Sequence, residues 1–338
     1  MRTQELVIEE PGRIELQERE IDEDLRPNEA LVAAEYSIVS AGTEGAHFSG
    51  LVQEMPGKRV EYPTRTGYGH LGRVLAVGSD VTMCEVGDRV LSFANHASIT
   101  KIDAHRMALP VPATFDGKQL VFARMAGVSV SSLRSSSIQP GDTVVVIGMG
   151  LVGNFAAQLF QLAGATVLAV DISDERLEFA RRCGITRTVN SAENDLREAV
   201  EDWTDGKGAH TVVEAIGNSD VIEEAVFLAR RFGEVILLGS PRARAEIDVT
   251  PMLLQIHLEA IRLIGSLEWR WPLHETPRTR DIVSNYRQLV KWITTGDLCV
   301  EPLLTHLASP ADCQDMYEGL TEQKAEYLGV VFDWNQIK

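Results

Sequence analysis

The sequence predicts an α/β protein that combines a doubly wound parallel sheet with a second, β-rich domain. A β-branched run, Thr143–Ile147, leads into a glycine-rich turn and a segment with helical spacing of apolar residues, which is how a Rossmann unit begins. Strand-like and helix-like stretches then alternate as far as Gly265, as in a doubly wound sheet. Roughly the first 115 residues contain short strands broken by glycine turns, which indicates a compact β-rich module.

The elements expected in the β-rich part are short strands over residues 5–9, 13–18, 30–39, 72–77 and 86–93. Pro11-Gly12 is a turn between the first two. A helix over 120–133 is expected before the glycine-rich turn, and after it helices over 173–184, 221–231 and 281–294, with Ser173 as an N-cap. Further strands are expected at 166–170, 211–214, 234–238, 261–265, 303–307 and 328–331.

The glycine-rich turn matches the pattern G-x-G-x-x-G over residues 148–153. Gly148 allows the tight turn, Gly150 lets the backbone approach a pyrophosphate, and Gly153 lets the following helix pack closely on the strand. The helix N-terminus offers free N–H groups and a positive dipole end to phosphates. We therefore expect a dinucleotide at this turn, rather than a glycine loop of purely structural purpose.

Asp171, at the end of the next strand, indicates which dinucleotide binds. Its carboxylate can accept hydrogen bonds from the ribose hydroxyls of NAD, and its charge would repel the 2′-phosphate of NADP. The sequence therefore predicts an NAD site.

The composition is that of an ordinary globular protein, with 44% hydrophobic and 24% charged residues. A net charge of −17 argues against nucleic acid or an anionic membrane as a partner. No stretch approaches the ~18 continuous apolar residues of a membrane span, and we recognise no signal peptide. The four cysteines are far apart and form no C-x-x-C, so neither a disulfide framework nor a cysteine zinc cluster is indicated. We expect a cytoplasmic protein.

Four segments together resemble the medium-chain dehydrogenase/reductase superfamily, which has the zinc alcohol dehydrogenase fold, over nearly the whole chain. They are Val77-Gly78 through Val90, Pro140–Thr143, Asp171 with Arg176, and Ala215-Ile216-Gly217. The resemblance implies a GroES-like catalytic domain over 1–119, a Rossmann domain over 120–267, and a return to the catalytic domain over 268–338. It also implies a homodimer, because this fold often dimerises by pairing its last cofactor-domain strand. The expected cofactor-binding residues are Gly148, Met149, Gly150, Leu151, Val152, Gly153, Asp171, Ile172, Arg176, Ala215, Ile216, Gly239, Ser240 and Leu267.

The chain departs from the zinc-binding members at two ligand positions. Ala41 stands where those members carry a cysteine ligand, and Tyr68 stands where they carry a histidine ligand. The lobe of four cysteines that holds structural zinc is also missing. A tetrahedral site needs three protein ligands besides water, so we expect no catalytic metal unless His47, His70 and His96 build another site. Ser40–Glu44 resembles the S-P-G-T-E of a zinc-lacking branch that includes proteins similar to bacteriochlorophyllide a dehydrogenase, with Ala41 in place of its proline.

Hydride transfer without metal needs another donor to stabilise charge on the substrate oxygen and to handle its proton. The candidates are Thr43, where the family places a proton-relay hydroxyl, Tyr68, and His96, which titrates near neutral pH. Each has an ordinary alternative: Thr43 could cap a helix, Tyr68 could pack as an aromatic, and His96 could be a loop histidine. Glu44 is a candidate substrate residue or half of a structural ion pair. Trp269 and Trp271 are candidates for the substrate pocket or for an interface.

The sequence thus predicts a zinc-independent, NAD-dependent dehydrogenase that acts on a secondary alcohol or its ketone. Two alternatives stay open. The first is an NADPH-dependent quinone- or enoyl-type reductase, because such members also lack zinc and Arg176 follows Asp171 closely. The second is a non-catalytic NAD(H)-binding protein that has lost its catalytic activity together with the zinc.

Overall fold

The computed structural model describes residues 1–54, 60–242, 245–276 and 281–337. The chain divides into two compact units, which we describe separately. The β-rich unit comprises Met1–Met125, Trp271–Gly296 and Leu303–Lys338, and the parallel-sheet unit comprises Ala126–Arg270 and Asp297–Pro302. No helix in the described ranges is long and apolar enough to cross a membrane.

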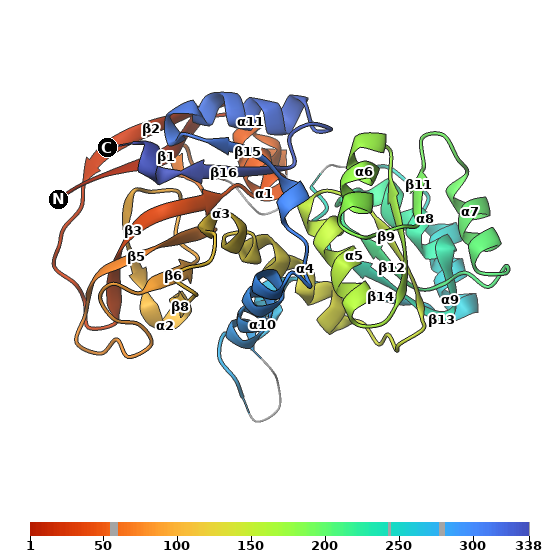
Figure 1. Ribbon diagram of the computed structural model, residues 1–338. Helices are drawn as coiled ribbons and strands as arrows, with labels where there is room; N and C mark the ends of the chain where they lie inside the picture. Colours follow the sequence, from red (N-terminus) through yellow and green to blue (C-terminus); the bar gives the residue numbers. More distant parts are fainter. Residues whose placement is uncertain (55–59, 243–244, 277–280, 338) are drawn as a thin grey trace. The chain divides into compact units, whose positions relative to one another are not determined.

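The β-rich unit is built mainly from antiparallel strands in two sheets, ordered β2-β1-β4 and β15-β16-β3-β5-β6-β8, with β7 also pairing with β3 (Figure 1). Its strands are β1 (Arg2–Glu10), β2 (Arg13–Glu20), β3 (Glu29–Ile38), β4 (Thr64–Arg65), β5 (His70–Val77), β6 (Arg89–Ser92), β7 (Ile99–Asp103), β8 (Leu109–Pro110), β15 (Leu304–Ala308) and β16 (Gly329–Asp333). The C-terminal strand β16 pairs antiparallel with β3, so the end of the chain completes the sheet that its beginning starts.

The helices of this unit are α1 (Ala41–Phe48), α2 (Ala104–Met107), α3 (Gly117–Leu120), α10 (Ile282–Thr295) and α11 (Cys313–Glu322). Helices α1 and α11 pack together, and the rings of Phe48 and Tyr317 lie 5.5 Å apart between them. Both rings belong to a core that also includes Leu6, Ile8 and Phe332. Buried apolar area of this kind is the main stabilising term of such a unit.

The parallel-sheet unit has the strand order β11-β10-β9-β12-β13-β14. The strands are β9 (Thr143–Ile147), β10 (Thr166–Asp171), β11 (Thr188–Asn190), β12 (Ala209–Glu214), β13 (Ala229–Leu237) and β14 (Arg262–Gly265). The strands of this sheet that the structure describes all pair in parallel. The order changes direction between β9 and β12, and ligands of open α/β sheets bind outside the carboxyl ends of the strands at such a switch point.

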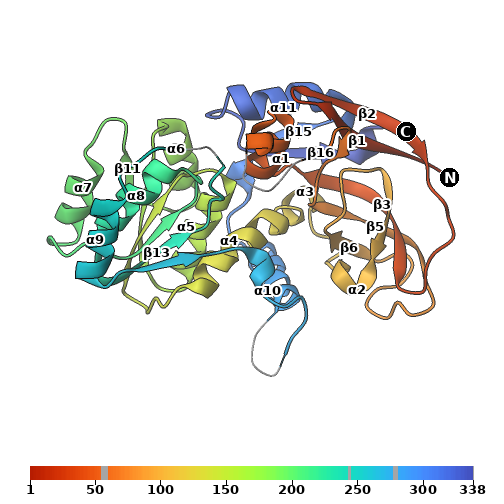
Figure 2. The ribbon, with the colours of Figure 1, turned by 180° about the vertical axis from the view of Figure 1, so that it is seen from behind.

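Helices cover both faces of this sheet, as the opposite views in Figures 1 and 2 show. They are α4 (Ala123–Ser135), which contains the boundary between the units, α5 (Leu151–Leu162), α6 (Asp174–Arg182), α7 (Leu196–Trp203), α8 (Ser219–Leu228) and α9 (Thr250–Glu259). Side chains of β9 alternate between the faces: Val144 and Val146 pack with residues of α5 and α6, whereas Val145 and Ile147 pack with residues of α7 and α8. Burial on both faces explains why these strands read as continuous β-branched runs.

The predicted fold class is confirmed, and several elements need correction. The helix expected over 221–231 ends at Leu228, because the backbone turns extended at Ala229 and β13 begins there. The single helix expected over 120–133 is divided, with α3 ending at Leu120 and α4 beginning at Ala123. Helices α7 and α9 and strand β11 have no counterpart in the prediction, since α9 buries none of its residues and β11 is short.

Candidate active site

The turn after β9 in the parallel-sheet unit is shaped by its glycines. Gly148 has a φ of 96°, which residues with a Cβ rarely adopt, and a methyl group there would lie 2.6 Å from Cγ1 of Ile216. A methyl group at Gly153 would lie 1.7 Å from the carbonyl oxygen of Gly148. At Gly150 a methyl group would meet no atom within 4 Å, so the backbone there faces open space. The turn therefore fits the close approach of a pyrophosphate.

Helix α5 begins directly after this open position. Its N-cap, Gly150, makes no side-chain hydrogen bond to the first turn. The N–H groups of Leu151, Val152 and Gly153 have no partner within the helix, as in every helix N-terminus, and they carry its positive dipole end. Free donors and open space at one point are what a phosphate anion requires.

Asp171, at the carboxyl end of β10, is tied to the glycine turn. One carboxylate oxygen, Oδ2, accepts the backbone N–H of Met149 at 2.6 Å, and Oδ1 accepts that of Ser173 at 3.0 Å. The Arg176 guanidinium lies 3.7 Å from Oδ2. Each oxygen has a second lone pair, so the carboxylate can still accept a bond from a ribose hydroxyl. The side chain is only 5% exposed, so it is fixed before any ligand arrives.

The ends of β12 and β13 meet at the same edge of the sheet. The N–H of Ala215 donates to the carbonyl of Ile147, and a methyl group at Gly239 would lie 2.2 Å from the nitrogen of Gly217. The carboxylate of Glu214 accepts the N–H groups of Ile216 and Gly217, at 2.7 and 2.8 Å. The structure therefore brings together three groups of predicted cofactor residues, namely those of the glycine turn, Ala215-Ile216 and Gly239-Ser240.

Glu214 was missed by the sequence reasoning. Burial raises the pKa of this carboxyl, and the N–H groups of Gly217 and Ile216 oppose the shift. The signal was present, because Glu214 ends an apolar strand just as Asp171 does. Its role is to hold the turn after β12 in place.

Large apolar side chains are exposed at the same edge. Ile172, Ile216 and Leu267 follow β10, β12 and β14, and they are 72%, 50% and 60% exposed. Exposed apolar residues gathered at one place commonly mark a binding site. These three predicted cofactor residues are suited to flank the flat rings of a dinucleotide.

In the β-rich unit, Tyr68 and Thr43 lie together, as the prediction of a relay requires. The Tyr68 hydroxyl donates to Oγ of Ser40, and it lies 3.5 Å from Oγ1 of Thr43. Ser40 is the N-cap of α1, so Thr43 lies inside the first turn and does not cap the helix. The hydroxyls of Ser40, Tyr68 and Thr43 thus lie close enough for a proton to pass from one to the next. We call them the Tyr68 hydroxyl group.

Arg124, at the start of α4, lies against the Tyr68 ring. The sequence reasoning also missed this residue. Its guanidinium carbon is 4.5 Å from the centre of the Tyr68 ring and 4.8 Å from that of Phe93. Its Nε donates to the Tyr68 carbonyl at 3.0 Å, and one terminal nitrogen donates to the Tyr286 hydroxyl at 2.5 Å. The side chain is 1% exposed. A charged residue inside the apolar stretch 120–133 was the only signal in the sequence.

Glu44 and His96 form a buried pair next to α1. His96 Nε2 lies 3.0 Å from Oε2 of Glu44, and the same oxygen accepts the hydroxyls of Thr66 and Tyr317 at 2.7 and 2.5 Å. Burial alone would raise the pKa of Glu44, but the charge and hydrogen bond of His96 outweigh it, with help from the Ser40 amide, so the pKa is lowered. Exposed fractions of 1% and 0% keep both side chains from solvent. The arrangement favours the structural alternative for Glu44 and His96.

The two tryptophans belong to different units. Trp269 lies in the parallel-sheet unit and is 50% exposed, whereas Trp271 is the first residue of the return to the β-rich unit and is half-buried. Their assignment to a substrate pocket stays a prediction.

The residues at the expected zinc position do not fit the metal. Ala41 has no donor atom, and the Tyr68 hydroxyl is bonded to Ser40. His70 and His96 are fully buried, and His96 is held by Ser37 and Glu44. Among the residues that the structure describes, no group of three His, Cys, Asp or Glu side chains could hold a metal ion.

Comparison with known proteins gives consistent relatives of low identity. A family described as zinc-binding dehydrogenase matches residues 152–284. The uncharacterised zinc-type alcohol dehydrogenase-like protein YdjJ of Escherichia coli is 21% identical over 98% of this chain and 99% of its own. Sorbitol dehydrogenase of Bacillus subtilis is 26% identical, with 80% of this chain and 81% of its own covered.

Solved structures share the fold over nearly the whole chain. Galactitol-1-phosphate dehydrogenase of E. coli superposes with a TM-score of 0.83 at 20% identity, over 98% of this chain and 99% of its own. A short chain alcohol dehydrogenase from E. coli CFT073, complexed with NADH, gives 0.82 at 19% identity with the same coverage. A zinc-binding dehydrogenase of Sinorhizobium meliloti bound to NADP gives 0.80 at 20% identity, again over 98% and 99%.

Proposed function

We propose that the chain is a zinc-independent, NAD(H)-dependent dehydrogenase of the medium-chain, zinc-type alcohol dehydrogenase superfamily and acts on CH–OH groups, as the matching family and the relatives suggest. In this proposal it transfers hydride between nicotinamide and the carbon of a secondary alcohol or its ketone. It would fall within the zinc-lacking branch to which Ser40–Glu44 points.

The observation that carries the proposal is the environment of Tyr68. This residue stands where the resemblance expects a histidine ligand, and its hydroxyl is bonded to Ser40 beside Thr43. The Arg124 guanidinium lies against its ring. A hydrogen-bond donor backed by a fixed positive charge can do for a substrate oxygen what a Lewis acid otherwise does.

The proton would move through side chains of this unit. In ketone reduction the Tyr68 hydroxyl donates its proton to the substrate oxygen, and a proton from solvent reaches the phenolate through the hydroxyl of Ser40 or Thr43, which gives one proton and takes up another. In alcohol oxidation the same path runs in reverse. Arg124 touches no substrate in this scheme and acts as a positioning residue, because it holds the Tyr68 backbone and ring. When bound, the nicotinamide ring accepts or supplies the hydride.

The preference for NAD rests on Asp171. The related structures include one with NADH and one with NADP, so kinship alone does not choose between them. A buried carboxylate at the end of β10 favours ribose hydroxyls and repels a 2′-phosphate. Arg176, at 3.7 Å, partly offsets that charge and favours the alternative of an NADPH-dependent reductase. Comparing NADH and NADPH affinities separates the two.

Relatives suggest which alcohols to try first. Sorbitol and galactitol-1-phosphate, named in two of them, are polyols with secondary hydroxyls. We propose a substrate of this class, with Trp269 and Trp271 as candidate contacts.

The test is a screen of secondary alcohols, polyols and their ketones with NAD(H) and NADP(H), run with and without a chelator. We expect turnover with NAD(H) that the chelator does not change. Activity that disappears with chelator and returns with zinc would contradict zinc independence. Absence of labelled hydride exchange with every substrate would favour the non-catalytic alternative.

Tyr68→Phe then tests the relay. Removing the hydroxyl should lower kcat about 10²- to 10⁴-fold with little change in KM. Tyr62→Phe is the matched control, because that hydroxyl donates to the His47 carbonyl, outside the Tyr68 hydroxyl group, and its loss should leave kcat unchanged. Full kcat in Tyr68→Phe would remove Tyr68 from the mechanism.

We also propose a homodimer in the cytoplasm. Strand β14 is an edge strand, and α9 beside it exposes Leu253, Leu254 and Leu258 by 54% to 57%. An open edge next to exposed leucines is suited to pairing with a second copy. Light scattering should give twice the chain mass, and Leu258→Lys should reduce it to one; a monomeric parent protein would contradict the proposal.

A further inference from the structure

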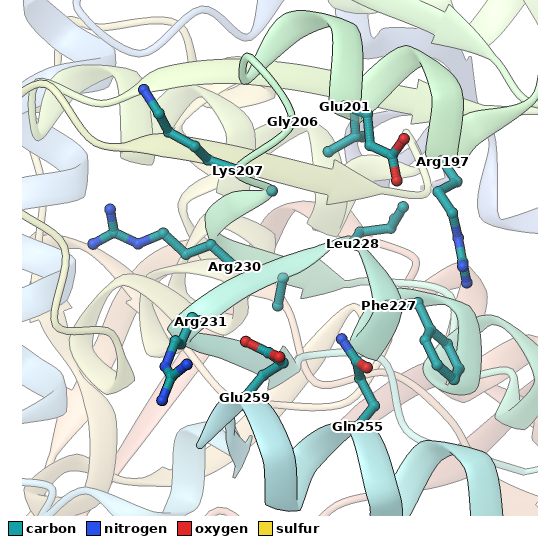
Figure 3. A pocket seen from close by; sticks show the side chains of 13 residues that line it. Arg197, Glu201, Gly206, Lys207, Phe227, Leu228, Arg230, Arg231, Gln255 and Glu259 are labelled. Carbon is teal, nitrogen blue, oxygen red and sulfur yellow. The ribbon is translucent and has the colours of Figure 1, made fainter.

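A cavity lies in the parallel-sheet unit, at the amino ends of β12 and β13. It has a volume of about 210 Å³. Its walls come from α7, the end of α8, the start of β13 and the second half of α9, and its floor comes from the loop before β12 (Figure 3). Because both strands run away from it, the cofactor residues lie at their opposite ends, about 20 Å along the sheet for six residues.

Four cationic side chains line this cavity, in a chain whose net charge is −17. Lys207, Arg230 and Arg231 extend on one side of it, and Arg197 lies on the other beside Phe227 (Figure 3). Lys207 lies 4.0 Å from Asp205, with both side chains exposed. Within the described ranges, none of the three arginines has a carboxylate within 4.0 Å. Two carboxylates, Glu201 and Glu259, also line the cavity, so its four cations leave an excess of positive charge for an anion.

Arg230 indicates more specifically that an anion binds in the cavity. Its Nε is buried and has no hydrogen-bond partner among the described residues. A buried donor without an acceptor is unfavourable, so a shift of this side chain that brings Nε to an anion in the cavity would be favoured. The loop before β12 packs closely against the start of β13, because a methyl group at Gly208 would lie 2.9 Å from the backbone nitrogen of Arg230.

The floor of the cavity is formed in advance of any ligand. Asp205, Gly206 and Gly208 have φ values of 53°, 74° and 76°, which fix the loop into a turn that few sequences adopt. Preformed backbone lowers the entropy that a ligand must lose on binding.

Two residues of α9 add acceptors to this cationic cavity. Gln255 and Glu259 extend from the helix between the arginines (Figure 3). The guanidinium carbon of Arg197 lies 4.8 Å from the centre of the Phe227 ring, and this contact holds the guanidinium in place (Figure 3). Carboxylate and amide oxygens accept bonds from hydroxyl groups, whereas arginine and lysine suit phosphate. The cavity thus offers separate partners for the two parts of a phosphorylated polyol.

We propose that this cavity binds a small phosphate ester that carries hydroxyl groups. Its phosphate contacts Arg230, Arg231 and Lys207, and its hydroxyls contact Glu259 and Gln255. The site is separate from the cofactor turn and takes no part in hydride transfer.

The experiment is calorimetric titration of the whole protein with ribose 5-phosphate and with inorganic phosphate, in low salt and with saturating NADH. NADH fills the glycine turn, which would otherwise bind phosphate itself. We expect one saturable site, with ribose 5-phosphate binding more tightly than phosphate. Arg230→Gln with Arg231→Gln should weaken binding roughly tenfold or more, since two charge-assisted bonds are lost.

The control is Arg187→Gln, an exposed arginine before β11 that lies outside the cavity and should leave affinity unchanged. If the double variant does not fold, Lys207→Gln, which changes an exposed side chain, replaces it and should also weaken binding. Absence of saturable binding, equal weakening by Arg187→Gln, or binding that NADH abolishes would each overturn the proposal. Equal affinity for phosphate and ribose 5-phosphate would overturn the assignment of Glu259 and Gln255.

Discussion

The glycine turn of the parallel-sheet unit and the residues around Tyr68 in the β-rich unit, which we call the Tyr68 group, are organised in different ways. The turn and Asp171 come from a strand, a helix and a second strand that follow one another in the chain. The Tyr68 group joins Ser40, Arg124 and Tyr286, which are far apart in the sequence. A motif made by neighbouring residues carries its geometry within itself, whereas the second group depends on the packing of the whole unit.

The strongest test of this difference is at two glycines of the turn. Gly153→Ala places a methyl group 1.7 Å from a backbone oxygen, so the backbone must move. We expect the free energy of unfolding to fall by about 3 kcal/mol. We also expect NADH binding to be lost. Gly150→Ala meets nothing within 4 Å, so Tm should be unchanged while NADH binding weakens by roughly tenfold or more through contact with the pyrophosphate. Melting curves and NADH fluorescence measure both. Equal Tm values for the two variants would contradict this account of the turn.

Arg124→Leu tests how far the Tyr68 group depends on packing between distant segments. It leaves the Tyr68 carbonyl and the Tyr286 hydroxyl without their donor, at about 1–3 kcal/mol each. We expect kcat to fall roughly 10²-fold, because Tyr68 loses its fixed position and the charge beside it, with KM for NADH unchanged. Arg124→Lys should recover part of kcat, because it restores the charge. A stability loss with normal kcat would make Arg124 purely structural.

Asp171→Asn removes one charge and keeps the volume of the side chain. NADH affinity should fall about tenfold, since a charge-assisted bond to ribose becomes a neutral one, and NADPH affinity should rise. Titration with both nucleotides measures the ratio. An unchanged ratio would mean that Asp171 serves only to hold Met149 and Ser173.

The smallest effect concerns acid stability of the β-rich unit. Burial, together with the charge of His96, lowers the pKa of His70 to about 3, against about 6.5 in an unfolded chain. Between these values the unfolded state binds the extra proton, so stability is complete above pH ~6.5 and decreases as pH falls, by about 1 kcal/mol at pH 5.5. Chemical denaturation at several pH values measures this slope. His70→Gln should have a flatter profile over that range, and an identical slope would exclude His70 as its source.

The sequence alone determined the fold class and the composition of the glycine turn. Gly148, Gly150 and Gly153 each answer a local requirement of backbone geometry, so their spacing carries the information. Periodicity gave most strands and helices, but it extended α8 by the residues that begin β13, because Arg230 and Arg231 suit either state.

Only the tertiary structure decided what surrounds Tyr68 and His96. Nothing in the local pattern tells that Arg124 lies against the Tyr68 ring, or that His96 is buried against Glu44 while Thr43 stays beside a hydroxyl. The same holds for the cationic cavity, whose residues come from three helices, the start of one strand and a loop. Contacts between distant segments depend on how whole elements pack, and local propensity does not encode that packing.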